Sequence, residues 1–331
     1  MPELRTDPLT GRGVIIAENR AGRPSDFAAE PREPIDDRPR ADCPFCPGNE
    51  SQNPEPTLVR FGDDGEWRIR VVPNLFPTVV PFDSPGNPFA ALGDQYRGGH
   101  EVVIETRRHL TRTSDLTEGE LAEVLQVCAE RLAFWRRESR APYRLVFKNV
   151  GPAAGASLLH LHSQVITLPE TPPGVAVELD NLAARGGAPW QDWLEGEVAD
   201  RDLIVASEAG FVACCPPASR TAYETWIMPA TTEPFFEDLA DRPDRLAAVA
   251  SLLHQNVAFV EGSLGADYNV MIQTSPTTPG ADQHFHWRIE VAPRIASIAG
   301  FELPTGLHVN TVAPETAAGR LRAALAPVVR A

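Results

Sequence analysis

The sequence predicts an α+β protein made of two tandem units, each an antiparallel sheet with packed helices. The chain presents the same order of elements twice, namely strands, one long helix and two closing strands. In addition, residues 145–169 and 267–293 both run from an Asn-containing strand through a turn of small residues into His-x-His and an apolar strand ending in proline. Self-similarity of this extent indicates duplication of one unit, although chance similarity between common hairpin patterns is the alternative. We place the units at residues 1–175 and 176–331.

The predicted strands are short apolar or alternating segments bounded by turn residues, a pattern typical of antiparallel sheets. In the first unit they occupy residues 13–18, 66–74, 99–106, 143–150 and 160–168. In the second unit a hairpin at 203–217 precedes strands at 223–229, 267–276 and 284–293. Much of the first 60 residues is rich in Pro, Arg and Asp and is predicted to be loop.

One long helix is predicted in each unit, at residues 114–139 and 242–264. In the first helix, Asp115 or Thr117 is suited to the N-terminal cap, because a short polar side chain there accepts a bond from a backbone N–H of the first turn. Apolar residues recur at the spacing of a helix that buries one face; these are Leu121, Val124, Leu125, Cys128, Leu132 and Trp135.

The composition excludes several classes of protein. Hydrophobic residues make up 43% of the 331 residues and charged residues 23%, which is typical of a folded globular chain. The formal net charge of -15 repels polyphosphate backbones and argues against a nucleic-acid binder. No apolar run approaches the length of a membrane span, and the charged start of the chain does not match a secretory leader. We therefore expect a cytoplasmic protein without a membrane partner.

The five cysteines are an odd number spread over a long chain, which does not indicate a disulfide framework. Cys43 and Cys46 form a Cys-x-x-Cys knuckle, and this spacing is half of a tetrahedral zinc site that needs two further ligands. The segment after the knuckle contains prolines and cannot start a helix, which argues against a thioredoxin-like redox pair. An unligated loop pair remains the alternative. Histidines are the better candidates for the missing ligands, because the other cysteines lie in segments that we expect to be buried.

Two histidines, His160 and His162, are one residue apart in a predicted strand. Residues i and i+2 of a strand point to one face, so the two side chains are expected to project together. A lone buried histidine is usually a hydrogen-bonded core residue, but two on one face favour a functional site. His109 is a third candidate, with an exposed loop histidine as the alternative. Lys148, the only lysine of the chain, lies just upstream of this segment.

The turn "GPAAGAS", residues 151–157, separates the two predicted strands that surround it. Gly151 and Gly155 lack side chains, so backbone N–H groups can approach a phosphate closely there. Such turns are common between strands. Beside an unprotonated imidazole, this one becomes a candidate cradle for a phosphoryl group under attack.

Taken in order, the motifs resemble one known family. They are "DPLTGRGVIIAENRAGRPSDF", "CPFCPGNE", "VVPNLFP", "GHEVVIETRRH", "NVGPAAGASLLHLHSQ", "YETWIMP" and "HWRIEVAPRIASIAGFELPTG". The chain is similar to the galactose-1-phosphate uridylyltransferases and the related ADP-glucose phosphorylase-like nucleotidylyltransferases of the histidine-triad superfamily. The resemblance covers nearly the whole chain, and it implies that each of the two units is histidine-triad-like.

The resemblance also implies roles for individual residues. The second histidine of His-x-His-x-Gln is the family's nucleophile, which implies His162, and Gln164 and Ser157 match residues that hold the reacting phosphate. Glu302 matches a residue that contacts sugar hydroxyls. Positions around the nucleotide and its phosphates are matched by Arg20, Arg23, Asn74, Asn149 and Gly155. One structural zinc is implied, bound by Cys43, Cys46, His109 and His160.

The chain departs from the family pattern in two places. Well-known uridylyltransferases have His-Pro-His-Gly-Gln, whereas Leu161 and Ser163 here are more similar to the phosphorylase-like branch. Some relatives carry a second metal on histidines whose positions here become Glu290 and Ala292. We therefore expect no second metal. His284 and His286 are expected to be structural or to lie near the substrate.

The function expected from the resemblance is transfer of a nucleoside monophosphate between a nucleotide sugar and a sugar 1-phosphate by a ping-pong mechanism. A nucleotidyl-histidine would be the intermediate, as expected of a UDP-glucose–hexose-1-phosphate uridylyltransferase-like enzyme. An ADP-sugar phosphorylase or a nucleotide-sugar hydrolase would use the same intermediate. The alternative outside enzymes is a zinc-stabilised nucleotide-binding regulator. The family resemblance also implies a homodimer.

Overall fold

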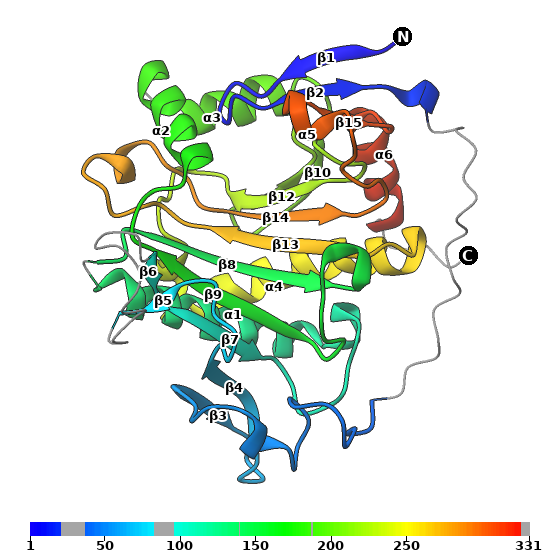
Figure 1. The fold of residues 1–331 in the computed structure, drawn as a ribbon. Coiled ribbons are helices and arrows are strands. Elements are labelled where there is room, and N and C mark those ends of the chain that lie inside the picture. Colours follow the sequence, from blue (N-terminus) through cyan, green and yellow to red (C-terminus); the bar gives the residue numbers. More distant parts are fainter. Residues whose placement is uncertain (21–36, 83–95, 139, 187, 326–331) are drawn as a thin grey trace.

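The computed structural model describes residues 1–20, 37–82, 96–138, 140–186 and 188–325 (Figure 1). Arg23 lies outside these ranges. The centre of the protein is a sheet of ten strands with the spatial order β10-β11-β12-β14-β13-β8-β9-β7-β4-β3. All neighbouring strands in this sheet are antiparallel. Five strands come from the first half of the chain: β3 (Leu58–Phe61), β4 (Trp67–Pro73), β7 (His100–Ile104), β8 (Tyr143–Val150) and β9 (His162–Leu168). Five come from the second half: β10 (Ile204–Glu208), β11 (Phe211–Cys214), β12 (Thr225–Pro229), β13 (Tyr268–Gln273) and β14 (Arg288–Pro293).

The sheet consists of two copies of one arrangement. In each half, three strands lie in chain order, the fifth strand pairs with the third, and the fourth lies at the inner edge. The inner edges, β8 and β13, pair with each other at the centre of the sheet, where Phe147 lies opposite Met271. The expected pair of α+β units, each an antiparallel sheet with a packed helix, is confirmed. The predicted boundary after residue 175 falls inside a helix, α2 (Pro173–Arg185), and stays a prediction.

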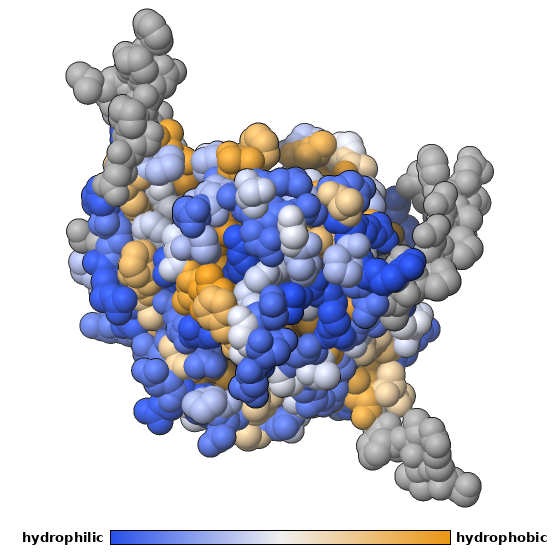
Figure 2. All heavy atoms as spheres, turned by 90° about the horizontal axis from the view of Figure 1, so that it is seen from below, coloured by the Kyte–Doolittle hydropathy of each residue, from blue (hydrophilic) through white to orange (hydrophobic). Residues whose placement is uncertain are grey.

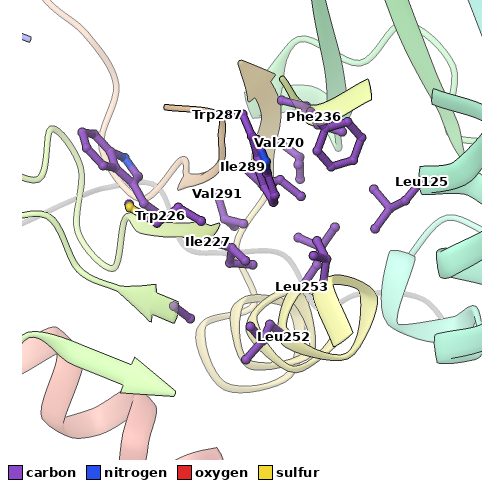
Figure 3. Packing of buried hydrophobic residues seen from close by; sticks show 14 of the residues in the cluster. Leu125, Trp226, Ile227, Phe236, Leu252, Leu253, Val270, Trp287, Ile289 and Val291 are labelled. Carbon is purple, nitrogen blue, oxygen red and sulfur yellow. The ribbon is translucent and has the colours of Figure 1, made fainter. Parts of the chain in front are cut away.

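One long helix per half covers the same face of the sheet. These helices, α1 (Glu118–Arg136) and α4 (Pro243–Phe259), lie side by side behind the sheet in Figure 1. Thr117 caps α1, because its side chain accepts from the N–H of Glu120 while the Glu120 side chain accepts from the N–H of Thr117. Figure 3 shows Leu252 and Leu253 of α4 near apolar side chains of the second-half strands, and these residues belong to the main core.

The opposite face of the sheet is covered mainly over its second half. There α2 contacts β14 through the buried ion pair of Glu178 and Arg288, and Trp190 packs against Trp226 of β12. Of this layer, only the strand at residues 13–18 was predicted from the sequence. The layer contains α2, α3 (Pro189–Trp193), α5 (Glu302–Thr305) and a small sheet of β1 (Glu3–Thr6), β2 (Gly13–Ile16) and β15 (His308–Asn310). The last helix, α6 (Pro314–Leu325), instead contacts α4 and the edge strand β10. A separate two-stranded sheet consists of β5 (Val80–Pro81) and β6 (Arg97–Gly98).

The surface seen in Figure 2 is largely hydrophilic, with hydrophobic side chains in small separate patches. In the described ranges, no helix combines the length and the apolar character needed to cross a bilayer. Buried apolar side chains instead gather between the sheet and its two covering layers.

Candidate active site and metal centre

A buried group of two cysteines and two histidines lies at the start of β9. The candidate ligand atoms of Cys43, Cys46, His109 and His160 all lie within 4.8 Å of one another. His160 Nδ1 is 3.6 Å from both sulfur atoms, and His109 Nδ1 is 3.2 Å from Cys46 Sγ. The structure thus brings together the four residues that the family resemblance implied.

The donor set fits zinc. Sulfur and nitrogen ligands at tetrahedral angles around zinc lie about 3.6 Å apart, because the metal–ligand distances are about 2.3 and 2.1 Å. His160 Nε2 lies 2.8 Å from the carbonyl oxygen of Thr106, which makes Nε2 the donor and leaves the Nδ1 lone pair for a metal. Burial lowers the pKa of His160 to about 4 and keeps the ring neutral. Burial raises the pKa of Cys43 to about 11, so a metal would displace a proton from this thiol.

The cysteine knuckle is held by polar contacts of its own. The Asn49 side chain donates to the carbonyl oxygen of Cys43 at 2.8 Å, and the backbone N–H of Arg40 donates to Cys46 Sγ at 3.3 Å. Phe45, inside the knuckle, contacts the ring of His162 edge-on with centroids 5.2 Å apart. The knuckle therefore supports the predicted nucleophile by packing as well as contributing to the metal group.

His162 is the first residue of β9, and its orientation is fixed by one hydrogen bond. Its Nδ1 lies 2.8 Å from the carbonyl oxygen of His160, so Nδ1 carries the proton and Nε2 keeps its lone pair in the neutral ring. Burial lowers the pKa of His162, which favours that neutral form, and 7% of the residue remains exposed. Because β9 starts here, His160 precedes the strand. Strand alternation therefore does not align the two histidines, but both rings contact Phe45, and separate hydrogen bonds orient them.

Gln164 lies two residues along β9, on the same face as His162. His100 accepts from the backbone N–H of Thr78 through Nδ1, so its Nε2 donates to Gln164 Oε1 at 2.8 Å. Asn74 Nδ2 donates to the same oxygen at 3.3 Å. The amide oxygen of Gln164 is thereby occupied, and its NH2 group is left for a ligand. His100 was missed by the sequence analysis, because its role depends on the pairing of β7 with β9.

Asn149 belongs to β8 and lies beside His162 when the β8–β9 register is continued by two pairs beyond Phe147 and Gln164. Its Oδ1 accepts from Asn269 Nδ2 at 2.8 Å, across the central β8–β13 pair. Asn269 Oδ1 in turn accepts from Arg294 Nε. Asn149 was predicted from the sequence, whereas Asn269 and Arg294 were not, because their roles follow only from the register between the two halves.

The turn after β8 has the conformation that glycine allows. Gly151 has a φ of 84°, and a Cβ atom there would lie 2.0 Å from Asp267 Oδ1. Asp267 accepts from the backbone N–H of Ala153 at 2.7 Å and fixes the turn. Gly155, also with a φ of 84°, and Ser157 are exposed beside it. The predicted phosphate cradle is therefore an ordered, accessible turn.

The remaining predicted residues lie farther along the same face or at its margin. Glu302 lines a cavity of about 160 Å³ together with Met271 of the central strand pair, Arg220, Arg294 and His308. Arg20 is exposed at the end of a short helical turn after β2. The predicted contact of Arg20 with the nucleotide stays a prediction.

A buried charge network lies behind the site, on the helix face of the sheet. Glu105 follows β7 and accepts from Lys148 Nζ and, at 2.6 Å, from Ser163 Oγ. Lys148 precedes Asn149 in β8, and Ser163 precedes Gln164 in β9. Successive residues of a strand point to opposite faces, so the side chains of Lys148 and Ser163 point away from the candidate site. This network ties β7, β8 and β9 together directly beneath His162.

The second half has a histidine in the position equivalent to His162, but it is structural. His286 Nδ1 accepts from the backbone N–H of Glu233 at 3.0 Å, and Nε2 donates to the carbonyl oxygen of Pro229 at 2.9 Å. Glu290, at a position of the second metal in some relatives, forms ion pairs with Arg220 and Arg288. His286 thus has the structural role that was one of its two expectations.

The duplicated sheet and the buried Cys2His2 group beside a histidine at the start of β9 define a histidine-triad-like protein of the nucleotidyltransferase type. The chain belongs to the galactose-1-phosphate uridylyltransferase-like family described as a domain of unknown function (DUF4921), whose model matches residues 86–330. Its curated relatives are phosphorylases and nucleotidyltransferases, which supports an enzyme.

Two curated relatives illustrate the range of the family. The chain is 32% identical over 339 residues to the ADP-glucose phosphorylase of Arabidopsis thaliana, covering 97% of this chain and 92% of the relative. It is 25% identical over 342 residues to the galactose-1-phosphate uridylyltransferase of Thermotoga maritima, covering 97% and 98%.

Solved structures give the same relationship. A crystal structure of ADP-glucose phosphorylase from Arabidopsis thaliana with bound ADP-glucose matches with a TM-score of 0.82 and 30% identity, covering 97% of this chain and 98% of that one. A structure of a uridylyltransferase matches with a TM-score of 0.71 and 26% identity, covering 98% of each chain. The α+β fold is that of this family.

Proposed function

We propose that this protein is a nucleotidylyltransferase that forms a nucleotidyl-histidine on His162, with an ADP-sugar as donor and inorganic phosphate as acceptor. The observation that carries the proposal is the hydrogen bond from His162 Nδ1 to the carbonyl oxygen of His160, 2.8 Å long. This bond leaves Nε2 unprotonated at the start of β9, beside the amides of Gln164 and Asn149. An imidazole in that state is a nucleophile that needs no separate base.

In the first half-reaction, the Nε2 lone pair of His162 attacks the α-phosphorus of the nucleotide sugar. The bond from that phosphorus to the bridging oxygen breaks, and its electron pair leaves with the sugar 1-phosphate. The NH2 groups of Gln164 and Asn149 would donate to the phosphoryl oxygens, where charge accumulates in the transition state. The backbone N–H groups of residues 153–156 already donate within the turn or to Asp267.

In the second half-reaction, an oxygen of inorganic phosphate attacks the same phosphorus. The P–N bond breaks, its electrons return to His162, and a nucleoside diphosphate is released. A sugar 1-phosphate in place of phosphate would give a new nucleotide sugar, which is the uridylyltransferase reaction. The P–N bond retains the energy of the bond that was broken, so both steps are reversible.

The choice of an ADP-sugar and phosphate rests on similarity. The relative and the solved structure called ADP-glucose phosphorylase are 32% and 30% identical, whereas the galactose-1-phosphate uridylyltransferases from Thermotoga maritima, Cryptococcus neoformans and Haemophilus influenzae are 25–27% identical. The uridylyltransferase activity is therefore the second candidate.

Zinc in the Cys43, Cys46, His109 and His160 group would fix the chain segment that precedes β9. Its four protein ligands leave no open position, which is typical of a structural site. The metal takes no part in either half-reaction. The homodimer and the cytoplasmic location remain further predictions.

Intact-mass spectrometry after mixing with ADP-glucose, UDP-glucose or a GDP-sugar tests the proposal. We expect an AMP adduct on the wild type and none on His162→Asn, whose zinc content reports that it is folded. His254→Asn is the matched control and should still form the adduct, because His254 lies on α4 and bonds to backbone carbonyls of residues 114 and 116. An adduct with UMP instead would favour the uridylyltransferase. No adduct with any donor would leave the nucleotide-binding regulator.

A further inference from the structure

Arg294 follows β14 and lines the cavity of about 160 Å³ that also contains Glu302. Met271 of β13 lies in the same cavity, and its side chain is on the same sheet face as Asn269, two residues away. Asn269 pairs with Asn149 of β8. The cavity is therefore on the same face of the sheet as His162. It lies on the far side of Asn149 from His162, over β13 and the end of β14.

Within the described ranges, Arg294 has no carboxylate within ion-pair distance. Its neighbour Arg220 is paired with both Glu224 and Glu290, and Arg288 is paired with Glu178 and Glu290. Burial and the neighbouring Arg220 cation lower the pKa of Arg294. The positive charge of the half-buried Arg294 guanidinium is therefore not neutralised by a carboxylate of the described residues. An anionic ligand could neutralise it.

A chain of hydrogen bonds links Arg294 to the residues beside His162. Arg294 Nε donates to Asn269 Oδ1, and Asn269 Nδ2 donates to Asn149 Oδ1 and to the carbonyl oxygen of Ala154. Both oxygens of the two amides are thereby occupied. Within the described part of the chain, the terminal nitrogens of Arg294 and the NH2 group of Asn149 have no hydrogen-bond acceptor and remain available as donors.

The strand spacing sets the scale of this row of donors. Adjacent strands lie about 4.8 Å apart, so Asn269 is about 10 Å from His162 measured across β9, β8 and β13. The Arg294 side chain reaches back from β14 to Asn269. A phosphoryl group joined through one bridging oxygen to the phosphorus at His162 falls within this span.

We propose that Arg294 binds the second phosphate group of the reaction, which is the phosphate of the departing sugar 1-phosphate and of the attacking inorganic phosphate. This inference rests on the proposed function. No covalent step is added, because Arg294 neutralises the oxyanion before attack and after departure. Arg294 would thus make phosphate a better acceptor than water, which carries no charge for the guanidinium to bind.

The experiment compares the two fates of a preformed adduct in wild type, Arg294→Gln and Arg294→Lys. Each protein is loaded with AMP from ADP-glucose and freed of donor, and loss of the adduct is followed by intact mass with increasing phosphate and without it. We expect Arg294→Gln to lower the second-order rate constant with phosphate by about 10–100-fold, the range for a hydrogen bond to a charged group. Hydrolysis by water should change by less than about twofold, because no anion is bound in that step.

Arg294→Lys keeps the charge but not the Nε bond to Asn269, so it should retain part of the reaction with phosphate. Arg68→Gln is the matched control: it removes one arginine charge on β4, where Arg68 pairs with Glu123 of α1, and should change neither rate. If Arg294→Gln slows phosphorolysis and hydrolysis equally, Arg294 is only structural and the inference is wrong.

Calorimetric titration with inorganic phosphate and with glucose 1-phosphate gives a measurement that needs no adduct. Binding to resting wild type should be weakened at least about tenfold by Arg294→Gln. If wild type forms no adduct, the proposed function is wrong, and this titration alone decides the anion site. Equal anion affinity of wild type and Arg294→Gln would overturn the inference.

Discussion

His162 and His286 occupy equivalent positions in the two halves, and their hydrogen bonds give them different chemistry. His162 uses one ring nitrogen to bind a backbone carbonyl, which leaves the other available. His286 uses both and is 2% exposed. Duplication supplies the same residue type twice, but only the hydrogen-bond environment separates a candidate nucleophile from a structural residue.

The pH dependence of stability should report the burial of His286. Burial lowers its pKa to about 4 in the folded state, below the value near 6.5 expected when unfolded. Below about pH 6.5 the unfolded chain therefore binds more protons, and the free energy of unfolding falls by up to about 1.4 kcal/mol per pH unit until about pH 4. Above pH 6.5 this contribution is fully retained.

His286→Gln keeps a polar tip but does not titrate, so its urea midpoint should fall less steeply than that of wild type between pH 7 and pH 5. The comparison of slopes isolates His286, because the other histidines are present in both proteins. Parallel slopes would show that the ring is protonated equally in the folded and unfolded states.

The site residues that could be predicted from sequence were those carried by short motifs. The Cys43–Cys46 knuckle and the His160–His162 pair can each be recognised from the spacing of their residues. In the structure, the four expected metal ligands lie together. His100, Asn269 and Arg294 carry no such spacing. Their partners lie on neighbouring strands, and which residues face each other depends on strand register and on the joining of the two halves.

At the level of elements, the knuckle and the start of β9 act as one unit. Its residues come from distant parts of the chain: the knuckle at 43–46, His109 after β7, and His160 before β9. Among the described residues around this group, a small apolar cluster is separate from the main core; it consists of Cys43, Phe45, Cys46, Trp67, Val72, Val102 and Ile104. A cluster of that size contributes little burial, so a bound metal would supply much of its stability.

Cys43→Ser should therefore remove bound zinc and lower the free energy of unfolding. A metal present at a thousand times its dissociation constant contributes about 4 kcal/mol, which is the loss we expect. Zinc content by atomic emission and the urea midpoint measure the two effects. Cys128→Ala is the matched control, because Cys128 is buried on α1 away from the group and should leave zinc content unchanged. Equal zinc content in Cys43→Ser would contradict the proposed metal site.

For the whole molecule, the repeated order of strands and helices was predictable because both copies keep the apolar periodicity of their long helix and closing strands. The layer on the other face was not. In α2 the buried residues are Val175, Glu178 and Leu182, so a charged residue interrupts the apolar stripe. Glu178 is buried only because Arg288 lies opposite on β14, and that pairing cannot be read from the segment itself.

The continuous sheet predicts that the two halves unfold together. The inner edges β8 and β13 share six residue pairs, and separating them would expose Phe147 and Met271 with their unpaired backbone groups. Two further hydrogen bonds join the halves: the hydroxyl groups of Tyr268 and Thr113 are 2.7 Å apart, and the Thr113 N–H donates to Glu261 at 2.9 Å. We therefore expect one cooperative transition rather than two.

Two probes can follow the halves separately in urea. Release of zinc to a colorimetric chelator reports the first half. Tryptophan fluorescence of Trp67→Phe/Trp135→Phe reports the second, because the other four tryptophans are at positions 190, 193, 226 and 287. The two midpoints should coincide, and each should shift when the central pair is weakened by Phe147→Ala. Zinc release at a clearly lower urea concentration than the fluorescence change would instead show that the halves are independent domains, joined at the predicted boundary near residue 175.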